Sequence, residues 1–236
     1  MDRLVCVSTT GDAALQTWMQ KALERFLEQK LTVPEPPIVS AAGRQLMEEM
    51  QLRMIFLPDL SHSVLDMLNE RLEWERIVVS LPEQFRLPGK WVAYEVIPKA
   101  GYMAGRYFND GLMKSIDVES RFRHPYTSGS ADDDLITSIL PKVRIILKPL
   151  GGRVMLQSAE EFNFVGNFLN FLREQTGENF TNLGDSDSWE YCRNKTSSNE
   201  PLLVGSRMDG GLKVVGKCQS HIRSSRIAFR FLVAFD

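Results

Sequence analysis

The residues best suited to metal or redox chemistry are few in this chain. It has three cysteines and three histidines, none paired at ligand spacing: Cys6, Cys192, Cys218, His62, His124 and His221. Thiolate and imidazole metal sites need several such ligands that converge on one point. The wide spacing favours three reduced, buried thiols, with a Cys192–Cys218 disulfide as the alternative. We therefore predict no metal ligands and no cofactor.

Several other polar segments could form a binding or catalytic site, but each also has a simpler structural explanation. Residues 8–12 lie between a predicted strand and a helix, where phosphate loops bind anions, but they lack the glycine spacing and lysine of a nucleotide loop. A turn with a helix cap at Asp12 accounts for them. Residues 132–134 are consecutive aspartates, which are typical of a solvated loop. We interpret His62 as a surface residue and His221 as a polar contact rather than a ligand or base.

Composition narrows the class of protein. The 236 residues are 43% hydrophobic and 25% charged, which is typical of a globular chain with one large or two small domains. A net charge of −2 gives no basic footprint, so nucleic-acid binding is not expected. No apolar run approaches the roughly 20 residues of a membrane span, and the N-terminus lacks a secretion signal. Cytoplasmic location and display on a particle both stay open.

The elements that must position these residues fall into two parts. Residues 1–84 alternate between β-branched apolar runs and segments of helical periodicity. We expect strands at 4–7, 54–57 and 77–79, and helices at 12–27, 45–50 and 60–72. Alternation of this kind predicts a small α/β domain with a partly parallel sheet. Residues 81–90, with two prolines and a glycine, read as a linker.

Residues 85–236 begin and end with strand-like segments. We expect strands at 91–97, 143–147 and 227–235, the first and last able to pair and cover each other's edges. Ser158 and Glu161 form a capping box that starts a long helix, and Gly177 is placed to end it. Asp185 is a candidate cap for a second, short helix that would carry Trp189, Glu190 and Tyr191, as scaffold residues beneath the loops.

The order of elements from residue 158 onward carries a resemblance. Thr176 and Gly177 are followed by Leu183–Arg193 with its Trp-Glu-Tyr core, then by residues 204–206, and finally by Ala228, Phe229 and Arg230. This order resembles the formylglycine-generating-enzyme (sulfatase-modifying factor) family, a branch of the C-type lectin fold. The resemblance implies an α+β, C-type-lectin-like domain over residues 85–236, preceded by the small α/β domain.

The enzymes of that family use a copper-binding cysteine pair shortly after the Gly-Gly-Ser element. The matching stretch here, residues 207–218, offers only Cys218, and it comes late. Related iron oxidases need a histidine cluster, and the three histidines are scattered. The predicted function is therefore non-enzymatic. A metal-dependent oxidase, and a structural or effector subunit that assembles through residues 1–84, stay as alternatives.

The same fold is used by the variable proteins of diversity-generating retroelements. There, residues before the Gly-Gly-Ser-like strand and between it and the terminal strand are diversified to change ligand specificity. The resemblance implies that residues 193–200 and 207–225 bind a protein or other macromolecular ligand. In the second segment, polar side chains mostly alternate with glycine or apolar residues, which places one set outward. The predicted ligand-binding residues are Arg193, Asn194, Thr196, Ser198, Asn199, Arg207, Met208, Asp209, Lys213, Lys217, Gln219, His221, Arg223 and Ser225.

Overall fold

The structure of the protein is a computed structural model. It describes residues 13–60, 87–97, 139–186, 188–195, 199–205, 207, 211–213, 215–217 and 227–236. Within these ranges the architecture is α+β, with helices packed on two four-stranded sheets. The predicted strands at 4–7 and 77–79 and nearly all of the predicted helix at 60–72 lie outside the described residues. So do Cys6, Cys218, the three histidines and the aspartates at 132–134.

The first sheet combines strands from the early and the late parts of the chain. Its strands are β1 (Leu52–Leu57), β2 (Lys90–Glu95), β8 (Phe231–Ala234) and β3 (Arg153–Leu156), in the order β1-β2-β8-β3. All three of these pairings are antiparallel. The partly parallel sheet expected among residues 4–7, 54–57 and 77–79 stays a prediction, because the first and last of these segments lie outside the described residues. The predicted pairing of the first and last strands of residues 85–236 is confirmed in β2 and β8.

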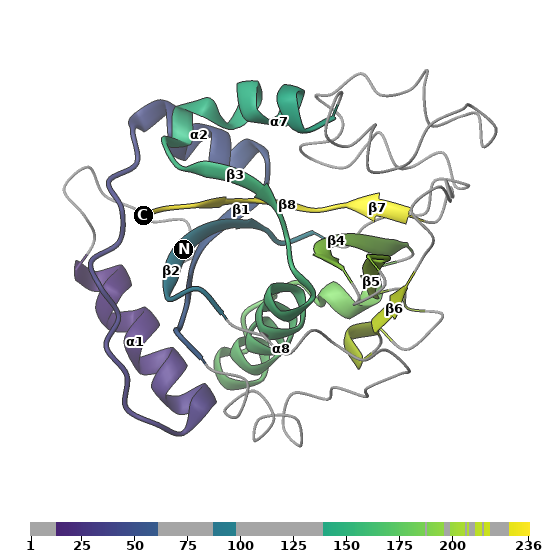
Figure 1. Ribbon diagram of the computed structural model, residues 1–236. Coiled ribbons are helices and arrows are strands. Elements are labelled where there is room, and N and C mark those ends of the chain that lie inside the picture. Colours follow the sequence, from purple (N-terminus) through teal and green to yellow (C-terminus); the bar gives the residue numbers. More distant parts are fainter. Residues whose placement is uncertain are drawn as a thin grey trace.

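The second sheet has the order β6-β5-β4-β7 and is formed late in the chain. Its strands are β4 (Trp189–Lys195), β5 (Pro201–Gly205), β6 (Val215–Lys217) and β7 (Ile227–Phe229). Strand β4 pairs with β5 antiparallel and with β7 parallel. In Figure 1 the yellow ribbon of β7 and β8 runs almost straight from one sheet into the other, with Arg230 at the junction.

Helices cover both faces of the first sheet (Figure 1). Helices α2 (Ala41–Glu49) and α7 (Leu140–Leu147) lie on one side, and α8 (Ala159–Thr176) lies on the other. Helix α1 (Ala13–Leu27) packs beside α8, with the Phe26 ring 5.3 to 5.6 Å from three phenylalanine rings of that helix. Three short 3-10 turns complete the described helices: η4 (Lys148–Leu150), η5 (Leu183–Asp185) and η7 (Gly211–Lys213).

Helix α8 begins and ends where its sequence predicts. The Ser158 hydroxyl accepts from the Glu161 backbone N–H at 3.2 Å, and the Glu161 carboxylate accepts from the Ser158 N–H at 2.7 Å. These reciprocal bonds satisfy two of the four N–H groups that a helix start leaves without partners. At the other end Gly177 has a φ of 67°, a left-handed conformation that glycine adopts without the steric cost of a Cβ.

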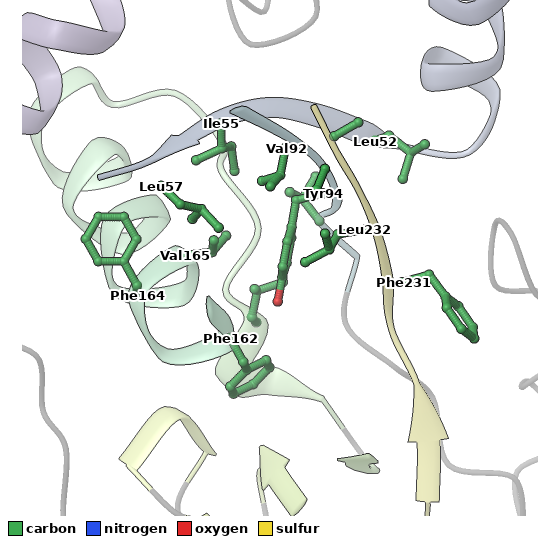
Figure 2. Packing of buried hydrophobic residues seen from close by; sticks show 14 of the residues in the cluster. Leu52, Ile55, Leu57, Val92, Tyr94, Phe162, Phe164, Val165, Phe231 and Leu232 are labelled. Carbon is green, nitrogen blue, oxygen red and sulfur yellow. The ribbon is translucent and has the colours of Figure 1, made fainter. Parts of the chain in front are cut away.

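The main core lies between the first sheet and α8. Figure 2 shows Ile55, Leu57, Val92 and Leu232 from three strands directed toward Val165 of α8. All of them belong to one continuous cluster of buried residues. That cluster includes residues from both sides of position 84, where the sequence suggested a domain boundary. The division into domains at 84 stays a prediction, but the described parts share one sheet and one core.

Two predicted strands and one predicted helix are corrected. Residues 143–147 are helical in α7, because that phase buries Val143 and Leu147 and leaves Ile145 74% exposed. The expected strand at 227–235 is two strands, β7 and β8, separated by Arg230.

Trp189, Glu190 and Tyr191 are in strand β4 rather than in a short helix. Their backbone pairs with β5 and β7 on either side, so sheet pairing takes precedence over the local helical tendency. Asp185 is not their cap. It lies inside η5, whose first turn is capped by the Asn182 side chain.

Candidate functional site

A buried ion pair joins the two most specific sequence elements. Arg230, between β7 and β8, donates from Nε and Nη2 to the two oxygens of the Glu190 carboxylate, each at 2.7 Å. Both side chains are fully buried. Arg230 also donates to the backbone carbonyls of Glu95, the last residue of β2, and of Ile97 just beyond it. One guanidinium therefore ties β4, β2 and the β7–β8 junction together.

The Glu190 carboxylate has two further donors. Gln157 Nε2 donates to it at 2.8 Å and Ser186 Oγ at 3.0 Å, while Tyr94 donates its hydroxyl proton to Gln157 Oε1. We call Tyr94, Gln157, Ser186, Glu190 and Arg230 the Arg230 cluster. Because each charged group in it is paired and hydrogen-bonded, the cluster meets the conditions under which buried charge is tolerated.

Electrostatics fix the protonation state of this cluster. Burial alone would lower the pKa of Arg230, but attraction to Glu190 and the hydrogen bonds to it raise that pKa above its ordinary value. Burial raises the pKa of Tyr94 well above 10.0, so its hydroxyl stays a donor at neutral pH. Neither the neutral Tyr94 phenol nor the Arg230–Glu190 ion pair readily gives up or takes a proton. The cluster therefore serves to position the strands.

A second cluster fixes the end of β4 against the start of α8. Arg193 Nη2 donates to Glu161 Oε1 at 2.7 Å, and its Nη1 donates to the Leu156 carbonyl at 2.8 Å. Asn194 accepts from the Ala159 N–H at 2.9 Å and donates to both oxygens of Glu160, at 2.8 and 3.0 Å. We call Ser158, Glu160, Glu161, Arg193 and Asn194 the helix-cap cluster.

The carboxylates of the helix-cap cluster are almost fully buried. Glu160 and Glu161 are only 3% and 2% exposed. Burial raises the pKa of Glu160, although hydrogen bonds from Ser158 and Asn194 act in the opposite direction. Burial would lower the pKa of Arg193, but the hydrogen bond to Glu161 raises it. Both carboxylates also lie in the first turn of α8, where the helix dipole favours negative charge.

The predicted ligand-binding residues do not all have the same role. Arg193 and Asn194 direct their polar groups into the helix-cap cluster, and this inward role has no signal in the local sequence. Asn199 and Arg207 are exposed. Lys213 lies in η7 and Lys217 in β6. The other predicted positions lie outside the described residues: Thr196, Ser198, Met208, Asp209, Gln219, His221, Arg223 and Ser225.

Leu212 fixes the segment after β5 onto α8. Its carbonyl accepts from Asn163 Nδ2 at 3.0 Å. A Cβ on Gly166 would lie only 2.3 Å from a Leu212 methyl group, and one on Gly184 would lie 3.1 Å from its Cγ. The absence of a Cβ at both glycines allows the close approach of this segment, a feature that the sequence alone does not reveal.

The described residues offer few groups for thiol or metal chemistry. Cys192 is a free thiol, is fully buried, and burial raises its pKa well above 9.0. No three His, Cys, Asp or Glu side chains among the described residues come together as a metal site. The helices in those ranges include none that is both long and apolar enough to cross a bilayer.

The two most specific sequence elements, Trp-Glu-Tyr and Ala-Phe-Arg, are neighbours in the structure. Trp189, Glu190 and Tyr191 pair with residues 227–229 in the parallel β4–β7 pair, and Arg230 follows directly after β7. Their charged members form the ion pair of the Arg230 cluster.

The chain matches no protein-family model, no curated protein and no solved structure.

Proposed function

We propose that this protein is a non-enzymatic binding protein that presents a diversifiable surface on a C-type-lectin-like scaffold. The observation that carries the proposal is the helix-cap cluster. It holds the last residues of β4 in place directly before the segment expected to vary. Lys195 pairs with Pro201, so residues 196–200 connect β4 to β5 between fixed ends.

The remaining predicted binding segments also connect strands of the second sheet. Residues 206–214 lead from β5 to β6, and residues 218–226 lead from β6 to β7. Leu212 fixes the first of these against α8, and the Arg230 cluster fixes the start of β8 just after the second. Sequence change between fixed strand ends alters a surface while leaving the packing beneath it unchanged.

The chemistry of these segments suits recognition of a macromolecule. Asn199 and Arg207 are exposed, and serine, asparagine and arginine give adaptable hydrogen bonding on a rigid support, as in antibody loops. The neutral, buried Cys192 thiol lies in the scaffold, whereas a copper oxidase needs reactive thiolates. The expected partner is a protein or another macromolecule, with no catalysis.

The gene locus provides the first test. Diversification by a retroelement requires a nearby, near-identical DNA repeat that differs at adenines, together with a reverse transcriptase gene. We expect the differing codons to fall within residues 196–200 and 207–225, outside the helix-cap cluster. A locus with neither repeat nor reverse transcriptase would contradict the diversifiable surface.

A stability comparison provides the second test. One library randomises Asn199 and Arg207, which are exposed, and a matched library randomises Arg193 and Asn194. Changes at Arg207 should stay within about 0.5 kcal/mol of the parent, as expected for an exposed position, and changes at Asn199 should cost about 1 kcal/mol more, because its φ of 64° is left-handed. The second library should lose roughly 1–3 kcal/mol, because buried Glu160 and Glu161 lose their partners. Widespread unfolding in the first library would show that those positions serve the fold.

A further inference from the structure

An apolar pocket lies on the face of the first sheet that α7 covers, away from the α8 core. It has a volume of about 250 Å³ and is lined by α7, β3, β4 and Phe231 of β8. Figure 2 shows Phe231 directed to the side of β8 opposite the Leu232 side chain and the α8 core. Val154 and Leu156 of β3 also line the pocket. The volume exceeds the roughly 150 Å³ of an apolar cavity that accepts benzene.

Three basic side chains line the same pocket: Arg144, Arg193 and Lys195. Arg193 is committed to Glu161 and to the Leu156 carbonyl. Arg144, in the last turn of α7, is exposed and forms no ion pair with any residue that the structure describes. No acidic side chain is among the described residues that line the pocket. The site thus combines an apolar floor with a positive edge.

We propose that this pocket binds a small amphipathic carboxylate, with its alkyl or aryl body on the apolar floor and its carboxylate on Arg144. Pockets that bind small molecules combine mostly apolar walls with a few placed polar groups, and this one has both. Guanidinium pairs with carboxylate in a bidentate geometry, which makes arginine the natural recognition group. The site adjoins the proposed macromolecular surface at Arg193 and Lys195, but its ligand is held by Arg144 and the apolar floor, so the proposal does not depend on that surface.

The test uses three probes with the same chain and different head groups: octanoate, octan-1-ol and octylammonium. Titration of the full-length protein, followed by calorimetry or by chemical shifts, should rank octanoate first, octan-1-ol second and octylammonium last. Arg144→Gln should weaken octanoate binding by about tenfold, the size expected for one charge-assisted hydrogen bond. It should leave octan-1-ol binding unchanged, because the alcohol carries no charge.

Two variants separate the parts of the site. Leu140→Trp, on the α7 side of the pocket, should abolish binding of both octanoate and octan-1-ol by filling the apolar space. Lys142→Gln removes a cation from the same helix that does not line the pocket, so it should change neither affinity. Thermal unfolding of each variant confirms that it is folded before titration.

Three results would overturn the proposal. The first is no saturable octanoate binding at millimolar concentration. The second is equal affinity for octanoate and octylammonium, which would mean that charge has no part. The third is octanoate binding that survives both Arg144→Gln and Leu140→Trp, which would place the ligand elsewhere.

Discussion

The Arg230–Glu190 pair makes a quantitative prediction about stability. Arg230→Met leaves the Glu190 carboxylate fully buried, with only Gln157 and Ser186 as donors, and removes a donor from two backbone carbonyls. Removal of one partner from a buried ion pair costs about 3–5 kcal/mol. In a chain of this size, that loss corresponds to a fall in Tm of roughly 6–20 °C. Glu190→Gln should cost a similar amount, because the buried Arg230 then loses the carboxylate that accepts two of its hydrogen bonds.

The double variant distinguishes the pair from its parts. If the two side chains act together, Arg230→Met combined with Glu190→Gln should cost about 0.5–3 kcal/mol less than the sum of the single changes. Urea unfolding curves of the four proteins give the free energies, provided that the slope with denaturant stays constant. Lys90→Gln is the control, since it breaks the exposed pair with Asp236 and should change the midpoint far less. Additive costs, or a loss below about 1 kcal/mol for Arg230→Met, would refute the reasoning.

Three further changes test other contacts. Gly166→Ala should lower stability by about 1–2 kcal/mol, because crowding against Leu212 outweighs the gain in helix propensity; unchanged urea unfolding would contradict this close approach. Glu160→Gln should raise Tm relative to the parent, and the difference should grow as pH rises from about 4 to 7. The raised pKa of Glu160 means that its ionisation over this range destabilises the native parent, whereas glutamine does not ionise. A difference in Tm that does not change with pH would contradict this. Phe26→Ala should cost about 3 kcal/mol and shift one cooperative calorimetric transition, whereas two transitions with only one shifted would indicate separate domains.

Elements governed by local rules could be predicted from the sequence. The capping box at Ser158 and the glycine at 177 depend on neighbouring residues, and their positions in the structure match the predictions. The strand predicted at 91–97 is found at Lys90–Glu95, so its existence was predictable but its ends were not. The apolar run at 143–147 was misassigned because a short run of this kind fits a buried strand and a helix equally well. Proline in the first turn was the local signal for a helix.

The polar clusters required knowledge of distant contacts. Glu190 reads as a helix residue beside Trp189 and Tyr191, yet its partner Arg230 lies forty positions away. Arg193 and Asn194 read as exposed binding residues because nothing nearby in sequence shows that Glu160 and Glu161 bind them. The polar composition of residues 193–200 indicated an exposed surface, but tertiary packing decides whether each of these side chains points outward or inward.

The position of β8 has a consequence for how the chain reaches its native state. Residues 231–234 form an inner strand between β2 and β3, segments that precede them by well over a hundred and by about seventy-five residues. Contacts between such distant segments form slowly, because a long loop must close before they contribute. Until β8 inserts, β2 and β3 each present a strand edge without its partner, and such edges pair readily between molecules. We therefore expect aggregation during refolding to depend on protein concentration and to fall sharply once β8 has docked.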